Sequence, residues 1–249
     1  RGIRSLNYFY GYIYYSNFAK KLYLLRMKLF YWLLPYPQFI EVEVTTRCNL
    51  KCVMCEHTYW NEPAKDMTFE KFKYVVDQFP KLKWICVTGI GESFLNKDYL
   101  KMLRYLKSKN IWVELFDPFL LINEGISKEL LDTGIDRILI SMDAATKETY
   151  EKIRIGSNFE TVVDNIKNFV RIKDERNLFF PKIDFSYIIS KANIHEINNF
   201  IELVHSFGIK NTEISFTRIL HNYGEIKNLF TEIPDSIVQA AEKRAKELG

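Results

Sequence analysis

The order of short apolar runs and longer helical stretches constrains this fold most. Six runs read as strands, and each is followed by a segment that reads as a helix. The predicted strands cover residues 39–44, 84–88, 111–115, 136–141, 182–189 and 211–216. Short apolar strands that alternate with helices predict a parallel sheet with right-handed crossovers. Six units are too few for a closed eight-stranded barrel, so the pattern predicts an α/β fold, either an open partial barrel or a doubly wound sheet.

Three of the four cysteines lie in one short loop directly after the first predicted strand. Cys48, Cys52 and Cys55 are spaced Cys-x3-Cys-x2-Cys, so their thiolates can converge on one centre without help from the rest of the fold. The loop leaves the carboxyl end of the strand, which is where α/β barrels place their chemistry. The fourth cysteine, Cys86, falls inside the strand 84–88, and we expect it to be a buried, inert side chain.

Two kinds of metal site fit this loop. A zinc ion bound by the three cysteines and His57 has the permitted ligand types, although structural zinc sites usually take ligands from two separate knuckles. A [4Fe–4S] cluster held by only three thiolates keeps one iron open, and an open iron is where a substrate or cofactor binds.

Three sequence motifs, in order along the chain, resemble those of the radical S-adenosylmethionine (radical SAM) superfamily. They are TTRCNLKCVMC, TGIGESFLNKDYLKMLRYLKSKNI and LDTGIDRILISMDAATKETYEKIRIGSNFETVVDNI. The third is similar to the branch that includes the SPASM and Twitch maturases, and the resemblance covers about residues 39–216. It implies a partial (β/α)6 TIM barrel at 39–220, with an N-terminal helical extension at 1–38. We expect residues 221–249 to form a C-terminal loop and helix that lead into a C-terminal part the sequence lacks.

The resemblance also implies which residues bind the cofactors. The three cysteines of the loop ligate a [4Fe–4S] cluster. Met54 lies beside the adenine of S-adenosylmethionine. Gly91 lets the backbone approach this cofactor closely.

Four polar residues on later strand ends complete the implied cofactor site. Glu92 accepts hydrogen bonds from the ammonium group of S-adenosylmethionine, and Arg154 meets its carboxylate, which are the charge-assisted partners that such a zwitterion needs. Ser141 binds ribose or carboxylate, and Asn193 lies near the ribose. Each residue also has a plain structural reading: Glu92 as a solvated loop acid, Ser141 as a strand-end cap, Arg154 as a surface helix charge and Asn193 as a helix N-cap.

The sequence departs from the family pattern in three places. Ile90 and Ser93 stand where glycine and proline are common around the Gly-Gly-Glu segment. Residues 116–119 read Phe-Asp-Pro-Phe where the branch usually has a Thr-Asn-Gly turn, so the substrate side is expected to be unusual. No cysteine follows Cys86, so auxiliary clusters cannot be built from this chain.

The function implied by the resemblance is that of a radical SAM enzyme. The reduced cluster cleaves S-adenosylmethionine to a 5′-deoxyadenosyl radical, which abstracts hydrogen from a peptide or a small-molecule substrate. Such an enzyme needs an electron donor such as flavodoxin or ferredoxin. The alternative is a non-catalytic zinc- or Fe–S-binding scaffold with a degenerate barrel. The sequence itself does not select a substrate.

Composition adds weaker constraints. A formal charge of +4, from 35 basic and 31 acidic residues, gives no reason to expect nucleic acid as a partner. The cysteine pattern suits a reducing compartment, so we expect a cytoplasmic protein. Residues 17–34 read as a basic, aromatic-rich helix, which predicts either packing against the outside or bottom of the barrel or contact of residues 1–38 with a membrane surface.

Overall fold

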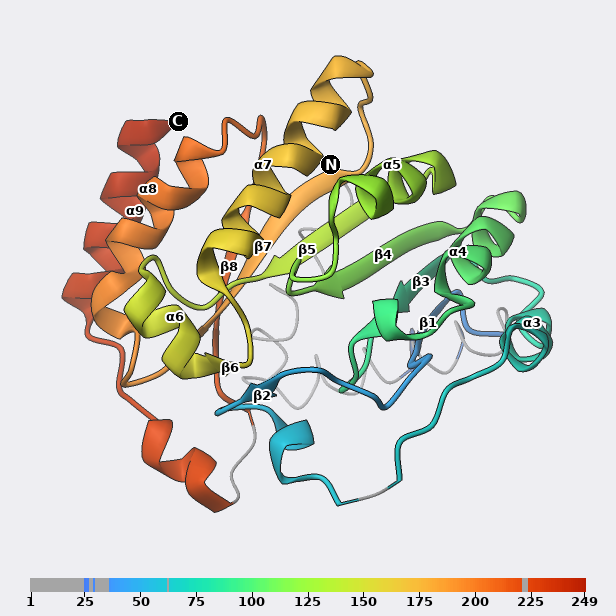
Figure 1. Ribbon diagram of the computed structural model, residues 1–249, viewed down its shortest axis with the longest axis horizontal. Helices are drawn as coiled ribbons and strands as arrows, with labels where there is room; N and C mark the ends of the chain where they lie inside the picture. Colours follow the sequence, from blue (N-terminus) through green and yellow to red (C-terminus); the bar gives the residue numbers. More distant parts are fainter. Residues whose placement is uncertain (1–24, 27–28, 30–35, 62, 221–223) are drawn as a thin grey trace.

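The computed structural model describes residues 25–26, 29, 36–61, 63–220 and 224–249. In this part of the chain, six parallel strands form one sheet in the order β1-β3-β4-β5-β7-β8 (Figure 1). All six predicted strands are confirmed. Their bounds are β1 (Phe39–Val42), β3 (Trp84–Val87), β4 (Trp112–Asp117), β5 (Arg137–Ser141), β7 (Lys182–Ile189) and β8 (Ile214–Arg218).

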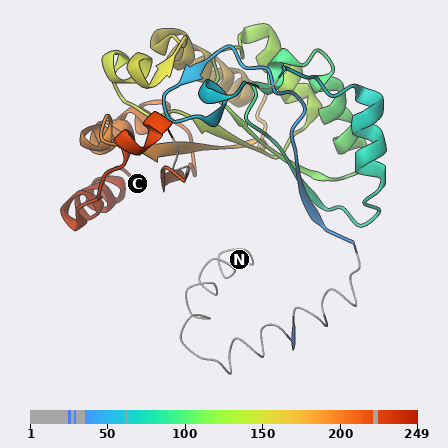
Figure 2. The same cartoon turned by 90° about the horizontal axis from the view of Figure 1, so that it is seen from below.

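The α-helices that connect these strands lie on one side of the sheet, and its other side is the concave face (Figure 2). This arrangement confirms the partial barrel and excludes the doubly wound sheet, which would carry helices on both faces. The helices are α3 (Phe69–Asp77), α4 (Tyr99–Ser108), α5 (Glu124–Thr133), α6 (Lys147–Ile153), α7 (Phe159–Glu175), α8 (Ile197–Ser206) and α9 (Asp235–Leu248). The short 3-10 turns are η2 (Glu56–Tyr59), η3 (Ser93–Leu95), η4 (Ile194–Glu196) and η5 (Gly224–Leu229).

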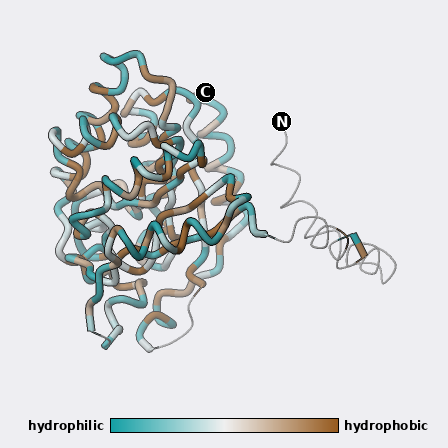
Figure 3. The backbone as a smooth tube through the Cα atoms, turned by 90° about the vertical axis from the view of Figure 1, so that its right-hand side faces the viewer, coloured by the Kyte–Doolittle hydropathy of each residue, from teal (hydrophilic) through white to brown (hydrophobic). Residues whose placement is uncertain are grey.

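Successive side chains along each strand point alternately to the helices and to the concave side, so the two faces of the sheet carry different residues. In β3, Ile85 and Val87 are fully buried in the main core with the helices, while Trp84 and Cys86 point to the concave side. Figure 3 shows the apolar and hydrophilic stretches that alternate along the chain.

The ends of the helices follow the sequence signals closely. Thr68 caps α3 by accepting a hydrogen bond from the Lys71 amide, as its position predicts. Gly134 and Gly208 follow α5 and α8 with φ of 73° and 68°, the left-handed conformation that glycine adopts without a steric penalty.

A second, two-stranded sheet was not predicted from the sequence. Its strands are β2 (Lys51–Cys52), inside the cysteine loop, and β6 (Arg154–Ile155), which pair antiparallel with Cys52 opposite Arg154. The sequence predicted that residues 146–154 are helical, but α6 ends at Ile153. The ladder therefore ties the cysteine loop to the segment that follows the fourth strand of the main sheet.

The predicted N-terminal extension, residues 1–38, falls largely outside the described residues. Of the predicted helix 17–34, the structure describes Leu25, Arg26 and Leu29, all in helical conformation and exposed. No described helix combines the length and the apolar character that crossing a membrane requires.

Candidate active site

A pocket of about 380 Å³ lies at the carboxyl ends of the strands, between the sheet and the cysteine loop. It brings together residues that are more than 100 positions apart in the sequence. Those of the predicted site that line it are Cys48, Cys52, Met54, Cys55, Gly91, Glu92, Ser141 and Arg154. Asp117, which the sequence did not assign to cofactor binding, lines it as well.

Local hydrogen bonds order the cysteine loop. The Thr58 hydroxyl donates to the Cys52 carbonyl over 2.6 Å, and the Leu50 amide donates to the Cys48 sulfur over 3.4 Å. None of the cysteines forms a disulfide. Burial raises the pKa of the Cys52 thiol to about 11 and also raises the pKa of Cys48 and Cys55. The thiols are therefore protonated at neutral pH, and metal binding must displace their protons.

Arg154 is buried beneath this loop. Its guanidinium lies 2.6 Å from the Asp143 carboxylate, and both side chains are almost completely buried. Burial disfavours the charged form, but Asp143 outweighs it, so the pKa of Arg154 is raised. The reading of Arg154 as a surface helix charge is therefore wrong. The Arg154 Nε is buried without a hydrogen-bond partner.

Glu92 and Asp117 form a buried carboxyl pair on the opposite wall of the pocket. Glu92, only 3% exposed, is not a solvated loop acid. One Asp117 oxygen accepts a hydrogen bond of 2.6 Å from the Phe119 amide, and the other is buried without a partner. Burial, and then the charge of Glu92, raises the pKa of Asp117 well above its ordinary value, and burial also raises the pKa of Glu92. The two buried carboxyl groups therefore oppose each other's ionisation, and a positive group beside them would favour it.

Gly91 is required by the packing of two loops. A Cβ atom at this position would lie 2.1 Å from the Thr45 carbonyl oxygen and 2.8 Å from that of Arg47. The turn after β3 thus rests directly on the chain that leads from β1 into the cysteine loop, and the Glu92 amide donates to the Arg47 carbonyl over 2.7 Å. This contact fixes Glu92 relative to the cysteines.

Ser141 and Met54 also lie at the pocket. Ser141 ends β5, opposite Ser186 of β7 in the sheet register. Met54 is buried in a small apolar cluster with Leu50, Cys52 and Ile153, under the β2–β6 ladder.

Asn193 does not reach the pocket. Its side chain is fully buried, donates 2.8 Å hydrogen bonds to the carbonyls of Asp143 and Ile188, and accepts one from the Ser190 amide over 2.7 Å. It forms no side-chain helix cap either. Every polar atom of the amide is engaged with the protein, and Asn193 is not among the predicted residues that the pocket brings together. Its hydrogen bonds instead connect the segment that carries Asp143 to the end of β7.

His57 does not join the three cysteines at the pocket. Its Nε2 atom lies 3.0 Å from the Thr46 carbonyl oxygen, and the residue does not line the pocket. In the described ranges, no group of three or more histidine, cysteine or acidic side chains is arranged to hold a single metal ion. A four-iron cluster is a larger body than one ion, and its thiolates stand further apart.

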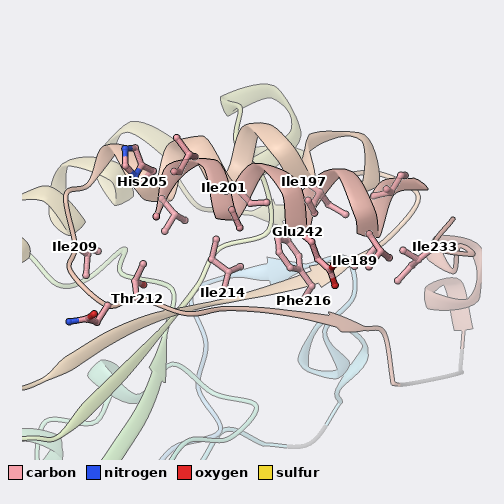
Figure 4. Close-up of a pocket in the computed structure, with 18 residues that line it drawn as sticks. Ile189, Ile197, Ile201, His205, Ile209, Thr212, Ile214, Phe216, Ile233 and Glu242 are labelled. Carbon is pink, nitrogen blue, oxygen red and sulfur yellow. The ribbon is translucent and has the colours of Figure 1, made fainter. Parts of the chain in front are cut away.

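A second cavity, of about 440 Å³, lies between α8, α9 and β8, away from the cysteines (Figure 4). Ile197 and Ile201 of α8 face Ile214 and Phe216 of β8 across it. Its lining is mostly aliphatic, and its polar residues are His205, Asn211, Thr212 and Glu242.

Sequence comparison identifies related proteins. The sequence model of the radical SAM superfamily matches residues 42–204. The tungsten-containing aldehyde ferredoxin oxidoreductase cofactor-modifying protein of Pyrococcus furiosus is 26% identical over 176 residues, which are 69% of this chain and 49% of that protein. The AdoMet-dependent heme synthase of Methanosarcina barkeri is 28% identical over 175 residues, 69% of this chain and 48% of that protein. The chain thus spans about half the length of these relatives.

Solved structures share the fold. SuiB of Streptococcus suis, bound to S-adenosylmethionine, superposes with a TM-score of 0.67 at 14% identity, covering 94% of this chain and 53% of that one. Native anSMEcpe with bound AdoMet gives a TM-score of 0.62 at 18% identity, covering 84% of this chain and 59% of that one.

Proposed function

This chain belongs to the radical SAM superfamily, and we propose that it binds a [4Fe–4S] cluster and S-adenosylmethionine in the pocket beneath the cysteine loop and acts as a radical SAM enzyme. The observation that carries the proposal is the convergence of three free thiols, a buried carboxyl pair and a buried arginine on one pocket at the carboxyl ends of the strands.

The residues present fit the two cofactors. Cys48, Cys52 and Cys55 supply three thiol ligands and leave one iron of a four-iron cluster open. Among the buried polar atoms that lack a hydrogen-bond partner in the described part of the chain, Asp117 Oδ2 and Arg154 Nε belong to residues that line the pocket. When bound, the reduced cluster supplies one electron that cleaves S-adenosylmethionine and so produces the 5′-deoxyadenosyl radical that takes hydrogen from the substrate.

The acidic and basic walls of the pocket orient the zwitterionic end of the cofactor. Glu92 and Asp117 together accept hydrogen bonds from the ammonium group, whose positive charge favours ionisation of both carboxyl groups. Arg154, whose orientation is fixed by Asp143, offers its free Nε–H to the carboxylate.

Other parts of the chain contact the rest of the cofactor and exclude water. Ser141, at the end of β5, donates to ribose or carboxylate oxygens. Met54 covers the adenine. The β2–β6 ladder and the apolar side chains under it close one side of the pocket to water, which protects a reactive intermediate.

The test is anaerobic reconstitution, followed by reduction in the presence of S-adenosylmethionine. The wild-type chain is expected to bind about four iron atoms and to form 5′-deoxyadenosine. Cys52→Ser should lose both, while Cys86→Ser, which changes a buried cysteine on β3, should keep both. Tightly bound zinc without cleavage would favour the non-catalytic scaffold.

Binding experiments test the role of Asp117 separately. Asp117→Asn is expected to weaken binding of S-adenosylmethionine about tenfold, because a charge-assisted hydrogen bond becomes a neutral one. Binding of 5′-methylthioadenosine, which has no ammonium group, should be unchanged. Equal loss for both ligands would contradict this role.

We propose a peptide as the substrate and flavodoxin or ferredoxin as the electron donor. Supporting the peptide, SuiB has been solved with its precursor peptide SuiA, and anSMEcpe with the Cp18Cys peptide. The mycofactocin maturase MftC of Mycobacterium tuberculosis is also 23% identical over 173 residues, 69% of this chain and 43% of that protein. We further propose that the chain belongs to the SPASM/Twitch-like branch and works in the cytoplasm.

A further inference from the structure

The turn that carries Glu92 is held at both ends by Arg47, the residue directly before Cys48. The Arg47 carbonyl accepts the 2.7 Å hydrogen bond from the Glu92 amide. The Arg47 guanidinium donates through Nη2 to the carbonyl of Leu95, the last residue of the 3-10 turn η3 that begins after Glu92. The Leu95 amide donates to the Glu92 carbonyl over 3.0 Å, which closes this turn. Arg47 therefore links the first cysteine of the loop to the whole turn that presents the Glu92 carboxyl group.

The Arg47 guanidinium is fixed from a second direction by Asp66. Arg47 donates from Nε to Asp66 Oδ1 over 2.9 Å and from Nη2 to Asp66 Oδ2 over 2.6 Å, so the ion pair is bidentate. The hydroxyl of the buried Thr45 donates to Asp66 Oδ1 over 2.6 Å and accepts a hydrogen bond of 3.1 Å from the Arg47 amide. Asp66 thus determines where the Arg47 side chain points.

The ion pair between Arg47 and Asp66 is better suited to orienting neighbouring groups than to stabilising the fold. The two side chains are 42% and 39% exposed, and water screens an ion pair this accessible, so its contribution to the free energy of unfolding is at most modest. Its geometry, in contrast, is specific. A lysine ammonium group at position 47 would be a single point charge and could not meet both carboxylate oxygens in the same fork.

We infer that Arg47, oriented by Asp66, is a positioning residue that sets the Glu92 carboxyl group relative to the first cysteine of the loop. The inference rests on the proposed function, in which Cys48 ligates the cluster and Glu92 accepts hydrogen bonds from the ammonium group of S-adenosylmethionine. The cofactor has to meet the cluster and Glu92 at the same time, so the spacing between Cys48 and Glu92 decides how tightly its zwitterionic end is bound. Neither Arg47 nor Asp66 lines the pocket, so both act through the turn.

Equilibrium binding to the reconstituted chain tests this role with two variants. Arg47→Lys keeps the charge but loses the fork, and Asp66→Asn keeps the size but places an NH2 group against the guanidinium. Both variants are expected to take up about four iron atoms per chain, as the wild type should. Their Kd for S-adenosylmethionine should rise about tenfold, the effect of misplacing one charge-assisted hydrogen bond, while the Kd for 5′-methylthioadenosine, which has no ammonium group, should stay the same. The double variant should bind no more weakly than either single variant, because both substitutions break the same bridge.

A matched ion pair far from the cysteines serves as the control. Arg244 donates from Nε to Glu202 over 2.9 Å at a similar exposure, so Arg244→Lys should leave both Kd values unchanged, and circular dichroism verifies that each variant is folded. Unchanged affinity of the two test variants for S-adenosylmethionine, or an equal loss of affinity for both ligands, would overturn the inference. Loss of iron uptake in Asp66→Asn would overturn it too, because the pair would then hold the cysteine loop together rather than position Glu92. A wild-type chain that binds no S-adenosylmethionine would overturn the proposed function itself, and the role of Arg47 with it.

Discussion

Replacing Asp117 with asparagine should stabilise the cofactor-free protein. One Asp117 oxygen has no hydrogen-bond partner outside the carboxyl pair, and it can share a hydrogen bond with Glu92 only while one of the two groups is protonated. Asparagine keeps the carbonyl that accepts from the Phe119 amide, and its NH2 group can donate to Glu92. Because a buried, unsatisfied polar atom costs about 1–3 kcal/mol, we expect Asp117→Asn to raise the free energy of unfolding by about 2 kcal/mol at mildly alkaline pH.

This gain should depend on pH in a definite direction. The pKa of Asp117 is raised in the folded protein, so the folded state binds more protons than the unfolded state. The wild-type protein therefore loses stability as the pH rises from the ordinary aspartate pKa of about 3.9 through the raised value. The advantage of Asp117→Asn should be greatest above the raised pKa and should disappear near the ordinary one.

Urea denaturation of the cofactor-free chain at several pH values measures the effect. Asp132→Asn serves as a control, because Asp132 is exposed and pairs with Arg176 at the surface. It should change the free energy of unfolding by less than about 0.5 kcal/mol at every pH. If Asp117→Asn were less stable than wild type at mildly alkaline pH, or equally more stable at all pH values, the account of the carboxyl pair would be wrong.

Three further substitutions have expected outcomes in the same assay. Gly91→Ala should destabilise the chain by about 1–3 kcal/mol, since its Cβ would overlap the Thr45 carbonyl; an effect below that range would show that the two loops do not pack as described. Glu196→Gln should cost about 2 kcal/mol at neutral pH, because Glu196 accepts hydrogen bonds from the Ala145 amide at 2.7 Å and the Thr146 hydroxyl at 2.7 Å. Burial raises the pKa of Glu196, but hydrogen bonds from Thr149, Thr146 and the Ala145 amide outweigh it and lower that pKa. The loss should therefore shrink as the pH falls through the pKa of Glu196, and a loss that is constant with pH would contradict the assignment. Ala241→Leu should stabilise the chain by about 1 kcal/mol, because it fills part of the cavity between α8 and α9; no gain would show that the cavity closes in solution.

The main sheet could be predicted because its strands are continuous apolar runs. A strand such as Trp84–Val87, buried among parallel neighbours, leaves a signal in its own composition. The cysteines and Glu92 could also be proposed as site residues from the sequence, because the spacing of the thiols and the turn after a strand are local features.

Other features depend on contacts between distant parts of the chain. The β2–β6 ladder has only two residues in each strand, which is too short for any periodicity, and the residues around Arg154 read as a solvated helix. The partner of Asp117 is 25 positions away, so no local pattern marks the pair. The backbone contacts of Asn193 could not be predicted either, because a polar residue after a strand has the same local sequence pattern whether it binds a ligand or hydrogen-bonds to the backbone.

The central claim is that three cysteines hold a cluster whose open iron binds S-adenosylmethionine. Electron paramagnetic resonance of the reduced, reconstituted protein tests it most directly, with and without S-adenosylmethionine. We expect a cluster signal that changes when S-adenosylmethionine is added, in the wild type and in Cys86→Ser, and no such signal in Cys52→Ser. A signal that S-adenosylmethionine leaves unchanged, or a protein that takes up zinc and no cluster, would contradict the claim.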